Sequence, residues 1–504
     1  MLLAVVLLFW AGAWRLRSTT TRQALLLAAS YVFYAIWGTL FLAALVASSI
    51  LNYWWGSVLR RRNTTGVLWI GIAINLLPLV FFKYLPHVLD VVTAGSSQRD
   101  VLSNVIMPIG MSFWTFQALS YLFDIYFGND TDPTLLEFCL YIAFWPTVLS
   151  GPVCRLPRML PQFRARPVLS MADLSAGALL VIQGAAMKFL IAQLLGSGWR
   201  PGTGVNAGFE LEGGWSAVDV WALGMGFGFQ LFFDFAGYSL MAIGVARIFG
   251  IAVAENFDRP FLSPSPSVFW TRWHMSLSFW IRDYVFAPLA SAWRRYSWWP
   301  YVVLVISMVL FGLWHGPKLT FMVYGFYQGV LLVMHRLGQQ AKERVAFRLP
   351  PTVGFVLACG TTFLLMTVGF IIFRANDLSQ AAAMIATLLS PGEYGHVELS
   401  HNFYALIVAV AASYFAVAGI QPALRSWRAR YRDVAAGLES PLAVAPPIPV
   451  NAVAVGAGSV VEFFAARLWW WMVPGLSILV VLAGLSMINR NSAITVTPFI
   501  YTLF

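Results

Sequence analysis

The chain has 504 residues, of which 59% are hydrophobic and only 11% are charged, and its net charge at pH 7 is +11. Soluble domains carry about 25% charged residues, so this composition excludes a soluble protein and predicts a polytopic membrane protein. The basic residues lie in short loops between apolar runs, where the positive-inside rule accounts for them without a nucleic-acid partner. The three cysteines lack paired or metal-ligand spacing, so neither a disulfide framework nor a metal site is predicted.

Residues 1–100 are expected to form N-terminal transmembrane hairpins. The apolar start, residues 1–14, has no basic residue before it and a basic cluster after it, so we interpret it as a retained span and not a cleaved signal. Residues 23–59 are too long for one crossing and have basic residues on both sides, which predicts a hairpin turning near Gly38. Residues 66–93 form a further span, interrupted toward its far end by Lys83 and Pro86.

Basic clusters at 60–62 and 155–166 enclose three apolar segments, residues 66–93, 105–127 and 134–151. If both clusters are cytoplasmic, three full crossings are impossible, and Pro108 and Gly110 make the second segment the best candidate for an exception. The same conflict recurs between Arg166 and Arg294, where the segments are 173–196, 215–250 and 268–290. The segment that cannot be a full crossing there, 268–290, contains His274. Irregular backbone at membrane depth requires a lining of protein or water, so a cavity is predicted at this segment.

Residues 269–289, FWTRWHMSLSFWIRDYVFAPL, embed polar groups in apolar sequence. In helical register His274, Ser278 and Arg282 share one face, opposite Trp270, Trp273, Leu277 and Trp280. A second histidine, His315, ends the apolar run 299–314. An ionisable group in hydrocarbon costs about 2.5–3.5 kcal/mol and usually marks function. Because histidine exchanges its proton near neutral pH, the two histidines predict proton chemistry inside a membrane.

Asp234 lies in the apolar run 215–250, with Gln230 and Tyr238 one helical turn away on either side. One interpretation is a buried carboxylate that supports helix packing, which the run's small residues also favour: Gly224, Gly226, Gly228 and Gly237. The other is a direct part in substrate binding, because acids inside a membrane are functional candidates. The sequence leaves both interpretations open.

The C-terminal part, residues 346–504, is expected to contain transmembrane helices and a tail. A span at 318–334 precedes this part, and spans are predicted within it at 351–373, 402–421 and 468–488. A loop between the first two of these contains Asp377, Glu393 and Glu398, and also His396 and His401 as solvated residues. Residues 438–456 resemble a mobile loop. The predicted fold is therefore an all-α, polytopic transmembrane helical bundle of about 11–13 membrane segments, including re-entrant pieces, around a central cavity. No internal repeat supports a transporter built from inverted halves.

Several blocks of sequence occur together and in a characteristic order. They are PIGMSFWTF (108–116), YLFDIY (121–126), SGPVCR (150–155), DFAGYSLMAIGVARIFG (234–250), ENFDRP (255–260), the segment 269–289, GLWHG (312–316), FRANDL (373–378) and PFIYTLF (498–504). From about residue 100 to the end, the chain resembles the membrane-bound O-acyltransferase family. The resemblance is to its bacterial polysaccharide O-acetyltransferase branch, the alginate O-acetylase type. One departure is Leu289, Ala290 and Ser291, where this branch usually has Leu-Gly-Gly.

The resemblance implies a catalytic core at residues 101–345 and an O-acyltransferase of the bacterial inner membrane. The enzyme would move acetyl groups from cytosolic acetyl-CoA across the lipid bilayer to an extracytoplasmic polysaccharide. It would work with a periplasmic or extracellular acetyltransferase partner and without a bound cofactor. The family's catalytic histidine matches His315, and its second functional histidine, with a role in positioning or proton relay, matches His274. Without the resemblance, His315 could be a packing residue at a span end, and Arg272 and Ser278 could simply satisfy His274.

The remaining candidates are expected to line the substrate site or cavity: Asp234, Tyr238, Gln230, Trp273, Ser278, Arg282, Asp283 and Trp314. Arg282 and Asp283 could form an ion pair, contact a phosphate or belong to a structural network. The tryptophans fit a cavity wall or an interfacial belt. Tyr501, in the tail, could accept the acyl group on its phenol and pass it on, or merely pack at the interface. Replacing Tyr501 with Phe should abolish acetylation in cells if this relay exists.

Two other functions remain open on the sequence. A D-alanyl transferase of the teichoic-acid type shares the RWH and WHG blocks, although the spans after residue 350 and the PFIY tail favour the acetyl branch. A transporter of lipid-linked sugars would need a large substrate path and would not depend on His315.

Overall fold

The computed structural model describes residues 18–92, 107–129, 131–165, 170–200, 202–293, 295–342 and 350–435. Within these ranges the regular structure is helical, without β-strands, which confirms the predicted all-α class. The chain separates into two compact units. The first contains the described parts of Met1–Leu190 and Phe233–Ala358, and the second contains Ile191–Phe232 and the described residues from Cys359 onward. Each unit is treated by itself below.

The described residues contain several helices that are long and apolar enough to cross a membrane. They are Thr39–Arg61, Thr65–Tyr84, Asp173–Ser197, Ala217–Ile248, Pro351–Arg374 and His401–Gly419, and two shorter apolar helices span Trp299–His315 and Leu378–Leu389. The protein is therefore a multi-pass membrane protein. The first span at 1–14, the loop at 438–456 and the last span at 468–488 lie outside the described residues, so the count of 11–13 segments stays a prediction.

The first unit begins with three long helices, whose order in the chain follows the predicted hairpin. Gly38, at φ +143°, separates α2 (Thr19–Ala35) from α3 (Thr39–Arg61), and α4 (Thr65–Val92) follows. Helix α6 (Met111–Tyr126) starts after Gly110, at φ +81°, where an added Cβ would meet the carbonyl oxygen of Val148. Only glycine tolerates both constraints, so α6 begins where the sequence predicts an interruption.

Shorter helices complete the core around α6. Helix α2 packs on α7 (Leu135–Ala143), and α3 and α4 pack on α6. Helix α8 (Leu156–Arg164) places Arg164 on Glu137, with Nε–Oε1 at 2.8 Å, so the buried carboxylate at the start of α7 has a cation beside it. The core contains many aromatic side chains, among them Tyr34, Trp114, Phe138, Phe144 and Phe249.

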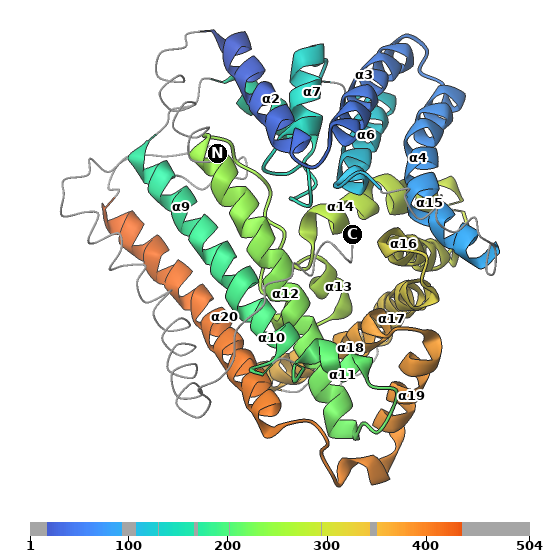
Figure 1. Cartoon of the computed structure of the whole chain (residues 1–504), viewed down its shortest axis with the longest axis vertical. Coiled ribbons are helices and arrows are strands. Elements are labelled where there is room, and N and C mark those ends of the chain that lie inside the picture. Colours follow the sequence, from blue (N-terminus) through green and yellow to red (C-terminus); the bar gives the residue numbers. More distant parts are fainter. Residues whose placement is uncertain are drawn as a thin grey trace. The chain divides into compact units, whose positions relative to one another are not determined.

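Helix α9 (Met171–Ala186) packs against the later part of α12 (Ala217–Ile248) through two pairs of glycines (Figure 1). An added Cβ at Gly177 would lie 2.6 Å from the carbonyl oxygen of Gly244, and one at Gly237 would lie 2.6 Å from that of Gly184. The two backbones approach this closely because neither carries a side chain at these points. After α9 the chain continues as the π-helix η1 (Met187–Ala192) and α10 (Gln193–Ser197).

The segment around His274 is broken into short pieces. They are the 3₁₀ turn η2 (Pro260–Leu262), α13 (Pro266–Trp270), α14 (Met275–Ile281), the π-helix η3 (Arg282–Phe286) and α15 (Ala287–Ala292). One continuous helical register for residues 269–289 is therefore wrong, because the chain leaves the helix after Trp270 and resumes at Met275. The break agrees with the expectation of irregular backbone in this segment.

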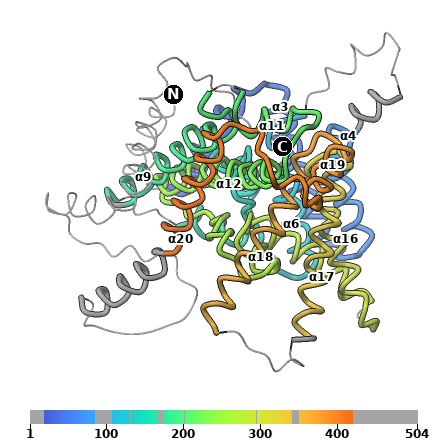
Figure 2. Tube along the Cα trace, turned by 90° about the horizontal axis from the view of Figure 1, so that it is seen from below, coloured from blue at the N-terminus to red at the C-terminus, as the bar shows by residue number. Residues whose placement is uncertain are grey.

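Helices α16 (Trp299–His315) and α17 (Leu319–Lys342) form a tight hairpin, and their tubes run side by side in Figure 2. Glycines again allow the approach: an added Cβ at Gly329 would lie 2.7 Å from the Cα of Val305, and Gly312 and Gly325 face backbone of the other helix. His315 is the last residue of α16 and therefore sits at the turn of this hairpin.

The second unit contains α11 (Val205–Glu210), the first part of α12, the part of α18 (Pro351–Arg374) from Cys359 onward, α19 (Leu378–Leu389), the 3₁₀ turn η4 (Pro391–Tyr394) and α20 (His401–Ala435). The glycines of α12 allow other helices to pack closely against it, as expected. Added Cβ atoms at Gly224 and Gly228 would each lie 2.7 Å from side chains of α18, and one at Gly226 would lie 2.8 Å from Ile407.

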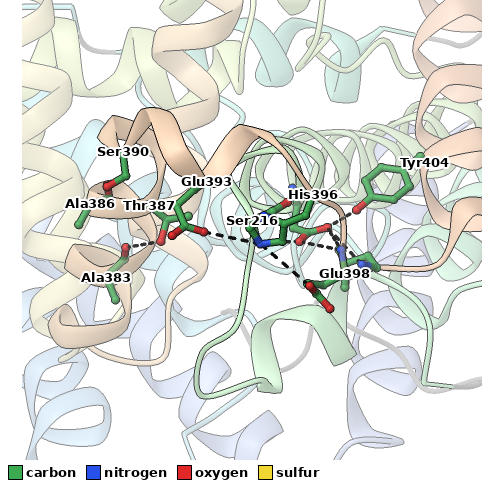
Figure 3. A network of polar contacts seen from close by, with 11 residues as sticks. Ser216, Ala383, Ala386, Thr387, Ser390, Glu393, His396, Glu398 and Tyr404 are labelled. Carbon is green, nitrogen blue, oxygen red and sulfur yellow. Dashed lines mark hydrogen bonds and ion pairs between the residues drawn. The ribbon is translucent and has the colours of Figure 1, made fainter.

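The prediction of a continuous loop after residue 373 is wrong for residues 378–389, which form α19. Asp377 caps this helix by accepting the backbone N–H of Gln380 at 2.8 Å. The Ser379 hydroxyl and this N–H lower the pKa of the Asp377 carboxyl. After the turn η4, residues 395–400 are irregular. Figure 3 shows His396 between Glu393 and Glu398, with N–O distances of 3.7 and 4.0 Å.

Candidate functional site

His274 occupies the break between α13 and α14. Its backbone has φ 43° and ψ 52°, a left-handed conformation that non-glycine residues rarely adopt, and it stands at the N-cap of α14. The side chain is only 2% exposed, and neither ring nitrogen has a hydrogen-bond partner among the described residues. Buried polar atoms in folded proteins are nearly always paired, so an unpaired imidazole in a strained position indicates a functional role.

Asn256 holds the start of α14 in place. Its carbonyl accepts the Met275 N–H at 2.9 Å, and its side-chain oxygen accepts the Ser276 hydroxyl at 2.6 Å. The Ser276 oxygen in turn accepts the N–H of Val153 at 2.9 Å. The strained backbone of His274 is thus fixed by the residues that follow it. The sequence signal for Asn256 was its place in the ENFDRP block, which by itself indicated no role.

His315 ends α16 and keeps part of its surface accessible, in contrast to His274. The next residue, Gly316, has φ 158° and ψ −177°, a conformation that is essentially restricted to glycine. The WHG block therefore has a local explanation: glycine stops the helix directly after the histidine, which places the imidazole at a helix end.

The indole of Trp314 lies next to both histidines. Its ring centroid is 4.6 Å from that of His315 and 6.3 Å from that of His274. Phe235 contacts His274 edge-on at 4.5 Å, and Phe116 lies 5.6 Å from Trp314. The structure thus brings together the two predicted histidines, 41 positions apart in the chain, in an aromatic surrounding.

Two further predicted residues, Trp273 and Ser278, make contacts within the segment around His274. Trp273 is buried and stacks on Phe269 at 5.4 Å between centroids. The Ser278 hydroxyl donates to the carbonyl oxygen of Trp273 at 2.9 Å, which bridges the break before α14. Both contacts stabilise the strained turn at His274, and the direct role in lining a substrate site stays a prediction.

Arg282 and Asp283 belong to a charged cluster on η3. Asp283 accepts from Arg282 Nε at 2.6 Å and from Arg155 at 2.7 Å, while the hydroxyl of Tyr284 donates to Asp124 at 2.8 Å. The Arg282 side chain is 60% exposed. Arg282 and Asp283 therefore form the predicted ion pair as part of a larger network. A contact between Arg282 and a phosphate remains a prediction.

Asp234 forms an ion pair with Lys188 of the π-helix η1. The Nζ–Oδ1 distance is 2.5 Å, and the two side chains are only 6% and 4% exposed. The sequence analysis missed Lys188, although a lone lysine in an apolar run was the available signal. Because a buried carboxylate requires a partner, the pair favours the packing interpretation of Asp234.

The neighbours predicted for Asp234 have other environments. Tyr238 packs against the apolar core of the first unit. Gln230 belongs to the second unit, where its side-chain N–H donates to Asn206 at 3.5 Å. Tyr501 lies outside the described residues. Within the described ranges there is no cluster of metal-ligating residues.

Lys83 was predicted only to interrupt a span, but in the structure it contacts the turn that carries His315. Its ammonium donates to the carbonyl oxygen of Trp314, and the hydroxyl of Tyr84 donates to that of Leu313. A single lysine within the apolar run of 65–84 was the signal that could have identified it.

Comparison with known proteins gives one family across the region that holds these residues. The family model described as MBOAT, membrane-bound O-acyltransferase family, matches residues 64–369, and a model of a family of unknown function matches residues 457–504. The chain is 32% identical to "Probable alginate O-acetylase AlgI" of Pseudomonas putida over 98% of this chain and 96% of that protein.

Two relatives named for other activities share shorter regions. The peptidoglycan O-acetyltransferase of Helicobacter pylori is 28% identical over 71% of this chain and 72% of that protein. The teichoic acid D-alanyltransferase of Streptococcus thermophilus is 31% identical over 56% of this chain and 68% of that protein.

Proposed function

Because the chain belongs to the membrane-bound O-acyltransferase family, we propose that this multi-pass enzyme moves acetyl groups from cytosolic acetyl-CoA to an extracytoplasmic polysaccharide. Similarity to an alginate O-acetylase over nearly the whole chain supports the acetyl group and a polysaccharide acceptor. The teichoic acid D-alanyltransferase shares only about half of the chain, which makes D-alanyl transfer the weaker alternative. The membrane would be the bacterial inner membrane.

One observation carries the proposed chemistry: the rings of His315 and His274 both lie near the indole of Trp314, at 4.6 and 6.3 Å between centroids, with His315 partly accessible and His274 buried. A neutral imidazole can accept a proton from a hydroxyl that attacks an acyl group. The accessible His315 is assigned as this base. His274, which contacts Phe235 and the shared indole, is assigned to positioning or proton relay.

The reaction follows from these roles. The acceptor hydroxyl attacks the carbonyl carbon of the acetyl thioester while His315 takes the hydroxyl proton. A C–O bond forms, the C–S bond breaks, and the imidazolium returns its proton to the departing thiolate. His315 ends neutral, and CoA leaves as the free thiol.

Delivery to the polysaccharide would involve a second protein, a periplasmic or extracellular acetyltransferase. The phenol of Tyr501 is proposed as the first acceptor, from which the acetyl group passes to that partner. Loss of acetylation in cells carrying Tyr501→Phe, with an unchanged amount of protein in the membrane, would support the relay, and retained acetylation would exclude it.

The proposed function is tested with purified protein in detergent and radiolabelled acetyl-CoA, with release of the CoA thiol as the measurement. Wild type should hydrolyse or transfer the acetyl group, and His315→Ala should reduce kcat by about 10²-fold or more, because general-base catalysis contributes that much. His401→Ala, at an exposed histidine of the second unit, is the matched control and should keep wild-type activity.

The alternatives give different results in the same assay. Activity with a D-alanyl thioester but not with acetyl-CoA would replace the proposed donor. Absence of thioester cleavage together with movement of a lipid-linked sugar across vesicles would favour a transporter.

A further inference from the structure

Two neighbouring residues of α4, Lys83 and Tyr84, contact the C-terminal turn of α16. The Lys83 ammonium donates to the carbonyl oxygen of Trp314, and the Tyr84 hydroxyl donates to that of Leu313. These acceptors are among the last four carbonyl groups of the helix, which have no partner within the helix itself. A positive charge at a helix C-terminus is also favoured by the helix dipole.

The same ammonium contacts the indole of Trp314, which lies near both histidines. Lys83 Nζ lies 5.3 Å from the centroid of the Trp314 ring, a cation–π distance. Lys83 thus touches both the backbone and the side chain of the residue that precedes His315.

The cost of placing a lysine here argues against an incidental contact. Helix α4 is one of the helices suited to cross a membrane, and Lys83 is the only charged residue between 65 and 84. A charge in such a helix is energetically costly and is kept where it serves a partner. The partner in this case is the turn that carries the proposed base.

The position of His315 at a helix end means that an anchor for this turn should affect the rate of catalysis. It is the last helical residue, directly before a glycine, and helix ends fray. A displacement of about 1 Å at a catalytic group can reduce a rate about 10²-fold. An anchor from another helix restricts this displacement.

We propose that Lys83 is a positioning residue for acyl transfer: its ammonium fixes the last turn of α16 against α4 and thereby holds the imidazole of His315 in place. The proposal rests on the proposed function of this site. It does not place Lys83 in contact with the reacting atoms, and it assigns Tyr84 a supporting part through its bond to Leu313.

Three substitutions separate the anchor from other effects. Lys83→Met removes the donor and the charge while keeping the side-chain length, whereas Lys83→Arg keeps both the donor and the charge. Lys318→Met removes an exposed lysine close to the same turn and serves as the control. The full-length proteins are compared in detergent by acetyl-CoA cleavage and by hydrogen–deuterium exchange of the peptide covering residues 309–317.

Lys83→Met should lower kcat by about 10- to 100-fold while KM for acetyl-CoA changes by no more than about twofold, because the base is displaced and donor binding is kept. The peptide 309–317 should exchange faster, and the melting temperature should identify any general loss of folding. Lys83→Arg should restore most of kcat and the slower exchange. Lys318→Met should match wild type in both measurements.

Wild-type kcat and exchange in Lys83→Met would overturn the proposal, as would a Lys83→Arg variant that is impaired as much as Lys83→Met. The exchange measurement does not depend on activity. If wild type cleaves no acetyl-CoA, the proposed function fails, and exchange at residues 309–317 alone then decides whether Lys83 holds this turn.

Discussion

At the scale of single residues, His274 combines a strained backbone with an unpaired, buried ring. The left-handed conformation costs about 1–3 kcal/mol for a non-glycine residue, and burial of unpaired nitrogens adds to this. If position 274 served packing alone, another residue could fill it without either cost. Sequence reasoning identified the residue from its surroundings, but the break in the helix that creates the strain has no signal in its periodicity.

His274→Asn tests whether the ring or the backbone of this residue matters. Asparagine tolerates the left-handed region and is a good N-cap, so the melting temperature should stay close to that of wild type. Because the imidazole is lost, kcat for acetyl-CoA cleavage should fall about 10²-fold. A folded His274→Asn protein with wild-type activity would assign His274 to structure alone.

The Lys188–Asp234 pair tests the role of a buried charge. Lys188→Met leaves the Asp234 carboxylate without its cation and should destabilise the protein by about 3–5 kcal/mol, measured by thermal unfolding in detergent. The double variant Lys188→Met/Asp234→Val removes both charges and should recover most of this stability. If Asp234 serves packing, the folded double variant cleaves acetyl-CoA. Loss of cleavage in a stable double variant would instead place Asp234 in substrate binding.

At the scale of elements, hydrophobic length and basic flanks predicted the long helices well. The hairpin at Gly38, the start of α6 after Gly110 and the hairpin of α16 and α17 follow from glycine, proline and charge positions. The π-helices η1 and η3 could not be predicted, because they depend on packing with other parts of the chain. Helix α19 was missed although its Asp377 N-cap and its amphipathic pattern were signals in the sequence.

Adding a methyl group at the glycine contacts between α9 and α12 should destabilise the protein. Gly184→Ala places a Cβ against the carbonyl oxygen of Gly237, so the helices must separate. We expect a loss of about 1–3 kcal/mol in stability, seen as a lower melting temperature in detergent.

Gly360→Ala is the matched control, because an added Cβ there meets no atom within 4 Å and alanine favours a helix. Its melting temperature should equal or exceed that of wild type. An unchanged melting temperature in Gly184→Ala would contradict the close approach of α9 and α12.

At the scale of the whole molecule, composition predicted a helical membrane protein, and the order of the motifs predicted the family. The sequence singles out the histidines at 274 and 315 as candidates, because polar residues in apolar runs are rare and costly, and their part in catalysis stays a prediction. Lys83, Lys188 and Asn256 were not, since each acts through a contact between segments distant in the chain. The local sequence shows that a polar residue in an apolar run is energetically costly, but it does not show which distant residue it contacts.

The central claim is that His315 is the base for the transfer of acetyl groups from a donor on one side of a membrane to an acceptor on the other. Its direct measurement uses proteoliposomes with radiolabelled acetyl-CoA outside and alginate or peptidoglycan fragments trapped inside. Wild type should label the trapped acceptor, alone or with its partner protein, and His315→Ala should reduce labelling about 10²-fold or more. Equal labelling by His315→Ala, or label that stays with acetyl-CoA in wild type, would contradict the account.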